Sequence, residues 1–214
     1  MARPREHDQR TRVALVAAAE QLVAAGGPPA LSVRAVADAV GTTTRAVYSL
    51  FGSKDGLVDA LAAQAFGYLG EGLAETPETN DPAADLVEVG ATMYRRFVQD
   101  HPSLYRIAFQ RIVPNFDLSP ELVEVRRRVW LQLEARLARL KEAGLLDDRS
   151  VTEAAVEFNA MCEGLANAEL RGGTLRREPG VDRETVWRDA LETIVRGLRP
   201  DPPPPGASSA PVEH

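Results

Sequence analysis

The sequence predicts an all-α protein of about nine helices, in which a small N-terminal helical unit precedes a larger helical domain. Three observations favour this fold class. Apolar residues recur at helical spacing along most of the 214 residues, no alternating strand pattern of useful length competes, and Pro77, Pro102, Pro114 and Pro179 fall between the periodic segments. The content of 44% hydrophobic and 26% charged residues is that of an ordinary globular protein.

The N-terminal helix is indicated by apolar residues at positions i, i+1, i+4, i+7 and i+8, on one face of a helix of about 17 residues. These residues are Leu15, Val16, Ala19, Leu22 and Val23. Two glycines and two prolines at 26–29 end this helix.

Residues 31–61 contain two further short helices. Ser32 is expected to cap the first, Gly41 supplies the turn after it, and the threonines at 42–44 cap a second helix that ends near Tyr48. Two helices of two turns with a short glycine-containing turn between them form a helix-turn-helix. The inner face of the first helix is expected to consist of Val33, Val36, Ala37 and Val40. Another helix should begin at Ser53-Lys54-Asp55.

Four longer helices are predicted in the rest of the chain. The first follows Asp81-Pro82, with Leu86, Val89, Gly90, Met93, Tyr94 and Phe97 on its inner face. The others are expected from Ser119 to Gly144, from a capping box at Ser150 to Gly172-Gly173, and from Asp182 to about Arg199. Residues 200–214 contain six prolines and are expected to be disordered.

The charge is distributed unevenly, although the chain as a whole carries −6. Residues 1–54 contain seven basic and four acidic residues, which gives +3, and residues 55–214 carry −9. This asymmetry is typical of a small polyanion-binding unit on an acidic body.

The second helix of a helix-turn-helix enters the major groove of DNA and presents its N-terminal residues to the bases. Val47, Leu50 and Phe51 are expected to anchor this helix to the core. The opposite side then carries four residues that can form hydrogen bonds with DNA, namely Thr43, Thr44, Arg45 and Tyr48. Lys54, at the start of the next helix, suits a phosphate group.

Residues 9–61 resemble the tetracycline-repressor (TetR) family of bacterial transcriptional regulators. The resemblance depends on Ala18-Ala19, Gly27, residues 32–37, Gly41, Tyr48, Phe51, Lys54 and Leu57, in the family's helix order. Two positions differ: Thr42 stands where the family usually has an apolar residue, and Arg45 where a small residue is common. Arg45 therefore alters which bases are read.

The resemblance implies roles at the matching positions. Ser32, Tyr48 and Lys54 are expected to contact phosphates, and Arg34 a base or a phosphate. Thr43, Thr44 and Arg45 are expected to meet base edges. Arg3, Arg5, Arg10 and Arg12 form either a DNA-contacting arm or a solvated terminus.

The resemblance also implies that residues 55–199 bind a small-molecule effector and form a homodimer through the last two long helices. Candidate cavity residues are Met93, Tyr94, Phe97, Tyr105, Phe109, Trp130, Phe158, Met161 and Cys162, with plain core as the alternative. Residues 101–109 and 163–166 faintly resemble a subgroup with a Trp-His-Gly signature, in whose place this chain has Cys162-Glu163-Gly164.

Small residues on the helix at 150–172 would let a partner helix approach closely; these are Ala160, Gly164, Ala166 and Ala168. The partner-facing residues of the helix at 182–199 are expected to be Val186, Ala190, Ile194 and Leu198. Arg126, Arg127 and Arg128 are expected to be solvated, because successive helical residues point about 100° apart. Cys162 is expected to be a buried small hydrophobic residue.

These features predict a regulator, expected to be a repressor, that binds a double-stranded DNA operator. An architectural DNA-binding protein and an enzyme on a helical scaffold are the alternatives, although no catalytic residue set, metal site or cofactor is expected. A secretory signal and a membrane span are not expected either, so a cytoplasmic location is expected.

Overall fold

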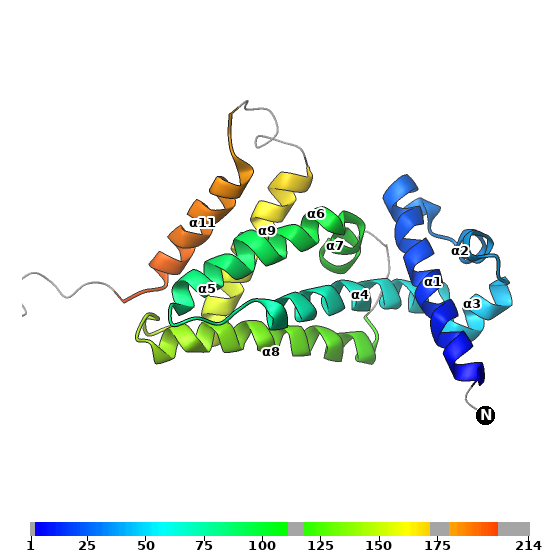
Figure 1. Cartoon of the computed structure of the whole chain (residues 1–214), viewed down its shortest axis with the longest axis horizontal. Coiled ribbons are helices and arrows are strands. Elements are labelled where there is room, and N and C mark those ends of the chain that lie inside the picture. Colours follow the sequence, from blue (N-terminus) through cyan, green and yellow to red (C-terminus); the bar gives the residue numbers. More distant parts are fainter. Residues whose placement is uncertain (1–2, 111–117, 172–179, 201–214) are drawn as a thin grey trace, which may run out of the picture.

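The computed structural model describes residues 3–110, 118–171 and 180–200, and every regular element in these segments is a helix. Figure 1 shows α1, α2 and α3 gathered at one end of the molecule, while α4 runs from them into a bundle of longer helices. In the segments described, no helix is long and apolar enough to cross a membrane. The tail expected to be disordered lies, apart from Pro200, outside the described residues.

The N-terminal unit consists of α1 (Arg3–Gly26), a 3₁₀ turn at Pro28–Ala30, α2 (Val33–Val40) and α3 (Thr44–Phe51). Its core contains apolar residues from all three α-helices, namely Leu15, Ala19, Val36, Ala37 and Val47. α1 is longer than the 17 residues predicted, because its polar first turns continue the helix N-terminal to the apolar stripe.

Helix α4 (Lys54–Glu75) belongs to both parts of the molecule. Its first turns pack against α1 and α3, and its later turns pack against α7 and α8. Leu57 and Leu61 are fully buried in the first part, and Phe66 and Leu69 are buried in the second. The last turn of α4 is capped by the buried Arg136, whose Nη2 donates to the carbonyls of Leu73 and Thr76 at 2.6 Å.

The single helix predicted after Asp81 is interrupted. It comprises α5 (Pro82–Glu88), a π-helical turn at Val89–Tyr94 and α6 (Arg95–Asp100). A separate helix, α7 (Pro102–Phe109), follows at once. Pro102 does not lie between helices as expected but occupies the first turn of α7, where its missing N–H costs no hydrogen bond.

The remaining helices are α8 (Pro120–Glu142), α9 (Val151–Leu170) and α11 (Arg183–Gly197). Their beginnings agree with the sequence prediction, and the capping box at Ser150 forms with Glu153. Glu169 joins three helices, since it accepts hydrogen bonds from Arg95 of α6 (3.1 Å) and from the indole of Trp187 of α11 (2.7 Å).

Candidate nucleic-acid interface and internal cavity

The helix-turn-helix has the predicted local geometry. Ser32 and Thr43 cap α2 and α3, since their hydroxyls accept hydrogen bonds from main-chain N–H groups three residues later, at 3.1 and 3.2 Å. Gly41 ends α2 with φ of 72° and ψ of 33°, a left-handed conformation that costs little without a Cβ atom. The turn is therefore held by local hydrogen bonds on both sides.

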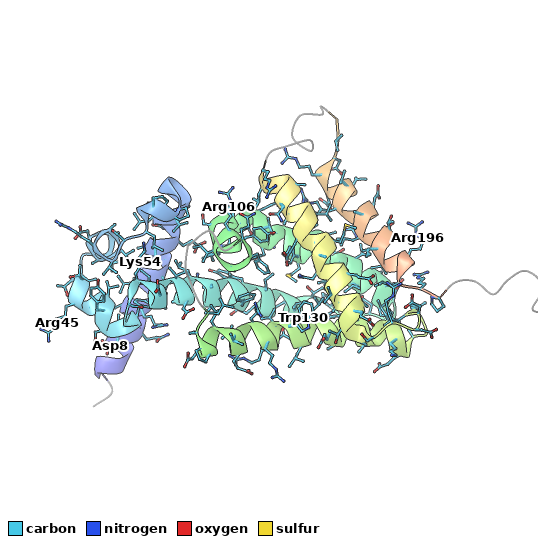
Figure 2. The ribbon with its side chains drawn as sticks, turned by 180° about the vertical axis from the view of Figure 1, so that it is seen from behind. Asp8, Arg45, Lys54, Arg106, Trp130 and Arg196 are labelled. Atoms are coloured by element: carbon cyan, nitrogen blue, oxygen red, sulfur yellow. The ribbon has the colours of Figure 1, made fainter. Side chains whose placement is uncertain are left out.

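All seven residues predicted to contact DNA are exposed: Ser32, Arg34, Thr43, Thr44, Arg45, Tyr48 and Lys54. Tyr48 is the clearest case, because an aromatic side chain that is 53% exposed has no packing reason to lie there. The side chain of Arg45 projects outward from α3 (Figure 2). Arg34 pairs with Asp38 at 3.8 Å, but both side chains are well exposed, so the pair is readily exchanged for another partner.

Helices α3 and α4 meet very closely, a feature that the sequence prediction missed. A Cβ atom on Gly56 would lie 1.9 Å from the carbonyl oxygen of Phe51. That oxygen also accepts a hydrogen bond from the Ser53 N–H at 2.8 Å. Glycine at 56 therefore fixes Lys54 and the N-terminus of α4 directly beside α3.

Arg12, for which the sequence left open a DNA-contacting arm or a solvated terminus, has a structural role. Its Nη1 donates to the carbonyl of Leu50 at 2.8 Å, and its guanidinium lies 4.6 Å from the centre of the Phe51 ring. Arg12 thus ties α1 to the end of α3. The arm is also not an extended segment, because α1 already begins at Arg3.

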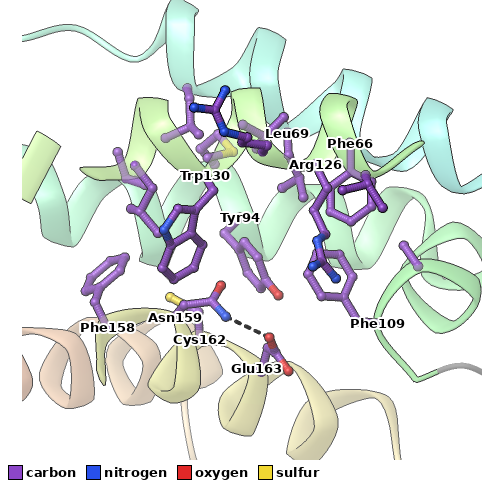
Figure 3. A pocket seen from close by; sticks show the side chains of 18 residues that line it. Phe66, Leu69, Tyr94, Phe109, Arg126, Trp130, Phe158, Asn159, Cys162 and Glu163 are labelled. Atoms are coloured by element: carbon purple, nitrogen blue, oxygen red, sulfur yellow. Dashed lines mark hydrogen bonds between the residues drawn. The ribbon is translucent and has the colours of Figure 1, made fainter. Parts of the chain in front are cut away.

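A cavity of about 610 Å³ lies between α4, α8, α9 and the segment 89–109, within the size range of small-molecule sites. Figure 3 shows five aromatic side chains around it, from Phe66, Tyr94, Phe109, Trp130 and Phe158. Of the nine predicted cavity residues, the structure brings six to its wall, namely Met93, Tyr94, Phe109, Trp130, Phe158 and Cys162. Phe97, Tyr105 and Met161 do not line it.

The cavity wall also carries polar groups. The hydroxyl of Tyr94, a residue only 7% exposed, forms no hydrogen bond of normal geometry among the described residues, although the Tyr105 hydroxyl lies near it. Burial raises the pKa of Tyr94 well above its usual value, so the hydroxyl remains a donor. Asn159 Nδ2 donates to Glu163 Oε1 at 2.7 Å, as the dashed line in Figure 3 shows. Cys162 is buried as predicted, and burial raises the pKa of its thiol.

Arg126 and Arg127 are exposed, as predicted, yet they also lie on the cavity wall, which the sequence prediction did not include. Arg127 pairs with Glu124 at 3.6 Å. Arg128, which points away on the same helix, does not line the cavity. A cavity position could not be recognised from the run of three arginines alone.

Helix α7 links the cavity to the N-terminal unit. Ala108 and Phe109 at its end line the cavity. At its start, His101 Nδ1 lies 2.9 Å from Glu20 Oε1 of α1, and the His101 ring stacks on Tyr68 of α4 with centroids 4.1 Å apart. A displacement of α7 is therefore expected to move α1 as well.

One face of α9 leaves small residues uncovered at intervals of four, namely Val156, Ala160, Gly164 and Ala168. Ala166, predicted to face a partner, is instead fully buried in its own chain. The same correction applies to Leu198, which packs inward with Trp187, Leu191 and Val195 of α11. Both errors have the same cause: Ala166 and Leu198 lie on the side of the helix that faces the core of their own chain.

Two family models match the chain. The model for bacterial regulatory proteins of the tetR family matches residues 15–61, and that for the tetracyclin repressor-like C-terminal domain matches residues 86–194, about half of the chain. No curated protein matches the sequence.

Several solved structures are similar over nearly their whole length. A protein of unknown function from Rhodococcus sp. RHA1 gives a TM-score of 0.73 at 22% identity, covering 89% of this chain and 96% of that one. The TetR family transcriptional regulator PfmR from Thermus thermophilus gives 0.64 at 25% identity, covering 87% and 99%. The fatty acid degradation regulator FadR from Bacillus halodurans gives 0.70 at 18% identity, covering 88% and 96%.

Proposed function

Because the chain belongs to the TetR family of bacterial transcriptional regulators, we propose that it is a homodimeric repressor that a small-molecule effector releases from a palindromic operator. In this proposal residues 1–54 bind double-stranded DNA, and residues 55–199 bind the effector and the second subunit. A protein that acts on an operator shares a compartment with the chromosome, so the proposal places it in the cytoplasm.

The observation that carries DNA binding is the exposed polar side of α3 beside the N-terminus of α4. Thr43, Thr44 and Arg45 lie at the start of α3, where a recognition helix meets base edges. Ser32, Tyr48 and Lys54 are exposed on the neighbouring turns of the N-terminal unit and α4 and supply donors for phosphates. Arg34 adds a positive charge at the start of α2.

The α7 connection supports effector control. If an effector fits the cavity better when α7 is in one position, its binding favours that position. The start of α7 is joined to α1 by the hydrogen bond between His101 and Glu20, so α1 is expected to move with it. In a dimer, the two recognition helices must lie about 34–36 Å apart, or a multiple of that distance, to enter successive major grooves. A small change in their separation is enough to lower operator affinity.

Dimerisation through α9 and α11 is supported by the uncovered stripe on α9 and by Val186, Ala190 and Ile194 of α11, which are only half-buried. A Cβ atom added at Gly164 meets no atom within 4 Å in its own subunit. Because Gly164 is also exposed, we expect the arginine of Gly164→Arg to extend into solvent in a monomer and to clash only with a partner helix. In analytical ultracentrifugation, Gly164→Arg and Ile194→Asp should sediment as monomers, while Thr193→Asp, an exposed control on α11, should remain dimeric.

Footprinting tests the function. A regulator protects one short palindrome, an architectural protein protects DNA broadly, and a protein that is not a DNA regulator protects none. Arg45→Ala should cost about 1–3 kcal/mol on the preferred site and relax one base position in each half-site. Lys54→Ala should weaken binding to all sequences and reduce the salt slope by about 0.9 per half-site, whereas Lys141→Ala, which changes the other lysine, should have no effect. An unchanged sequence preference in Arg45→Ala would refute the assignment of α3.

A further inference from the structure

The cavity has two chemically different ends. Helices α4 and α8 run parallel, because Ser119 N lies 3.4 Å from Asp59 Oδ1 near their starts and Arg136 reaches the Leu73 carbonyl near their ends. Phe66 and Arg126 therefore lie towards one end of the cavity, and Leu73 and Leu133 lie towards the other.

Helix α9 starts beside the later turns of α8, where Thr152 of α9 donates to Glu134 of α8 at 2.7 Å, and then crosses α8 steeply (Figure 1). Figure 3 shows Glu163 of α9 on the same side of the cavity as Arg126 and Phe109, and Phe158 on the opposite side. Figure 3 shows the Tyr94 hydroxyl directed towards Phe109 and Glu163, which is again this end. The cavity is thus amphipathic, with an apolar end between α4 and α8 and a polar end beside α7.

The polar end carries charges of both signs and several hydrogen-bond donors. The ionised residues in the lining of the whole cavity are Arg126, Arg127 and Glu163. Arg127 is paired with Glu124, and one oxygen of Glu163 is occupied by Asn159. Within the described segments, Arg126 has neither an ion-pair partner nor a hydrogen bond, and the buried Tyr94 hydroxyl has only the neighbouring Tyr105 hydroxyl within reach, with which it forms no hydrogen bond of normal geometry.

Resting on the proposed function, we infer that the effector is an amphipathic carboxylate, whose apolar body lies between α4 and α8 and whose anionic head lies between Arg126 and the Tyr94 hydroxyl. A carboxylate accepts hydrogen bonds from the guanidinium and the phenol at once, and such charge-assisted bonds are about twice as strong as neutral ones. A protonated amine would be attracted by Glu163, but it would be repelled by Arg126 and, having no lone pair, would offer Tyr94 no acceptor. An alcohol would offer Arg126 no charge.

Isothermal titration calorimetry on the full-length protein tests the inference. The probes are octanoate, dodecanoate and 4-phenylbutanoate, each with the alcohol and the amine of the same hydrocarbon body. At least one carboxylate should bind about tenfold or more tightly than its two counterparts. Arg126→Gln should remove this preference, and Arg128→Gln, two positions along α8 and off the cavity wall, should retain it. Tyr94→Phe, which keeps the ring, should weaken the carboxylate by about tenfold.

Three results would overturn the inference: an amine that binds best and is lost in Glu163→Gln, equal affinities for the three head groups, or no binding of any carboxylate. Arg126 is exposed, so its variant is expected to fold, and its melting temperature verifies this. The DNA footprint is measured in the absence of the carboxylates, alcohols and amines used in the calorimetry. A protected palindrome without carboxylate binding therefore contradicts only the effector class, whereas loss of the palindrome contradicts the proposed function itself.

Discussion

Gly56→Ala tests whether the contact between α3 and α4 is as close as the structure shows. The new Cβ atom would lie 1.9 Å from the Phe51 carbonyl oxygen, whereas such atoms essentially never approach within 3.0 Å. The two helices must therefore separate by more than an ångström, and the carbonyl's hydrogen bond to Ser53 is strained at the same time. Overpacking of this kind costs about 1–3 kcal/mol.

The expected change in melting temperature follows from that free energy. For a chain of this length, 1 kcal/mol corresponds to about 2–4 °C, so Gly56→Ala should lower the melting temperature by about 2–12 °C. Differential scanning calorimetry at one protein concentration measures it. Operator affinity well below this temperature should also fall, because Lys54 is displaced relative to α3.

Gly67→Ala provides the matched control on the same helix. Its Cβ atom meets nothing within 4 Å, and alanine is favoured over glycine inside a helix by about 1 kcal/mol. The control should therefore melt about 2–4 °C higher than the wild type. If Gly56→Ala also gained stability and kept its operator affinity, the close contact between α3 and α4 would be refuted.

Two further predictions concern side chains that join helices. Arg12→Met should lower the free energy of unfolding by about 1–2 kcal/mol, since it removes a hydrogen bond and the contact with Phe51, and an unchanged urea midpoint would contradict this. Burial opposes ionisation of Glu169, but the hydrogen bonds that the carboxylate accepts outweigh burial and lower its pKa below the usual 4.5. The ionised Glu169 therefore stabilises the folded protein above pH 4.5, and this stabilisation is lost as the pH falls through the folded-state pKa. Urea midpoints between pH 7 and pH 3 should show this loss, and Glu169→Gln should be less stable by about 1–3 kcal/mol at pH 7 and change less with pH.

The beginnings of helices with a side-chain cap could be predicted from the sequence because the bonds that define them are local, whereas those of α6 and α7, which have no such cap, were missed. The hydroxyls of Ser32 and Ser150 each bond to a main-chain N–H three residues away, and a pattern of that length is visible in the chain itself. The same applies to the left-handed turn at Gly41.

Features that depend on distant residues could not be predicted in this way. Arg12 finds Leu50 across 38 positions, and Gly56 matters only because α3 folds back against α4. Apolar spacing identifies inward-facing residues but cannot distinguish a void from a packed core, so it predicts Tyr105 together with Tyr94 although Tyr105 does not line the cavity. Arg126 was not predicted to line the cavity because the pattern selects only inward-facing apolar residues, whereas an exposed arginine can also border a cavity.

The π-helical turn at 89–94 has a consequence for comparing this chain with its relatives. The N–H of Arg95 reaches back five residues to the carbonyl of Gly90, so the turn holds one residue more than an α-helical turn. A residue inserted into a regular α-helix would rotate all later side chains by about 100° around the helix axis. The wider π-helical turn takes up the extra residue instead, so the faces of α5 and α6 keep the relation that they would have without it. A homologue one residue shorter at this point would form a continuous α-helix with both flanking faces unchanged, and a correct alignment would place a single-residue gap between Val89 and Tyr94.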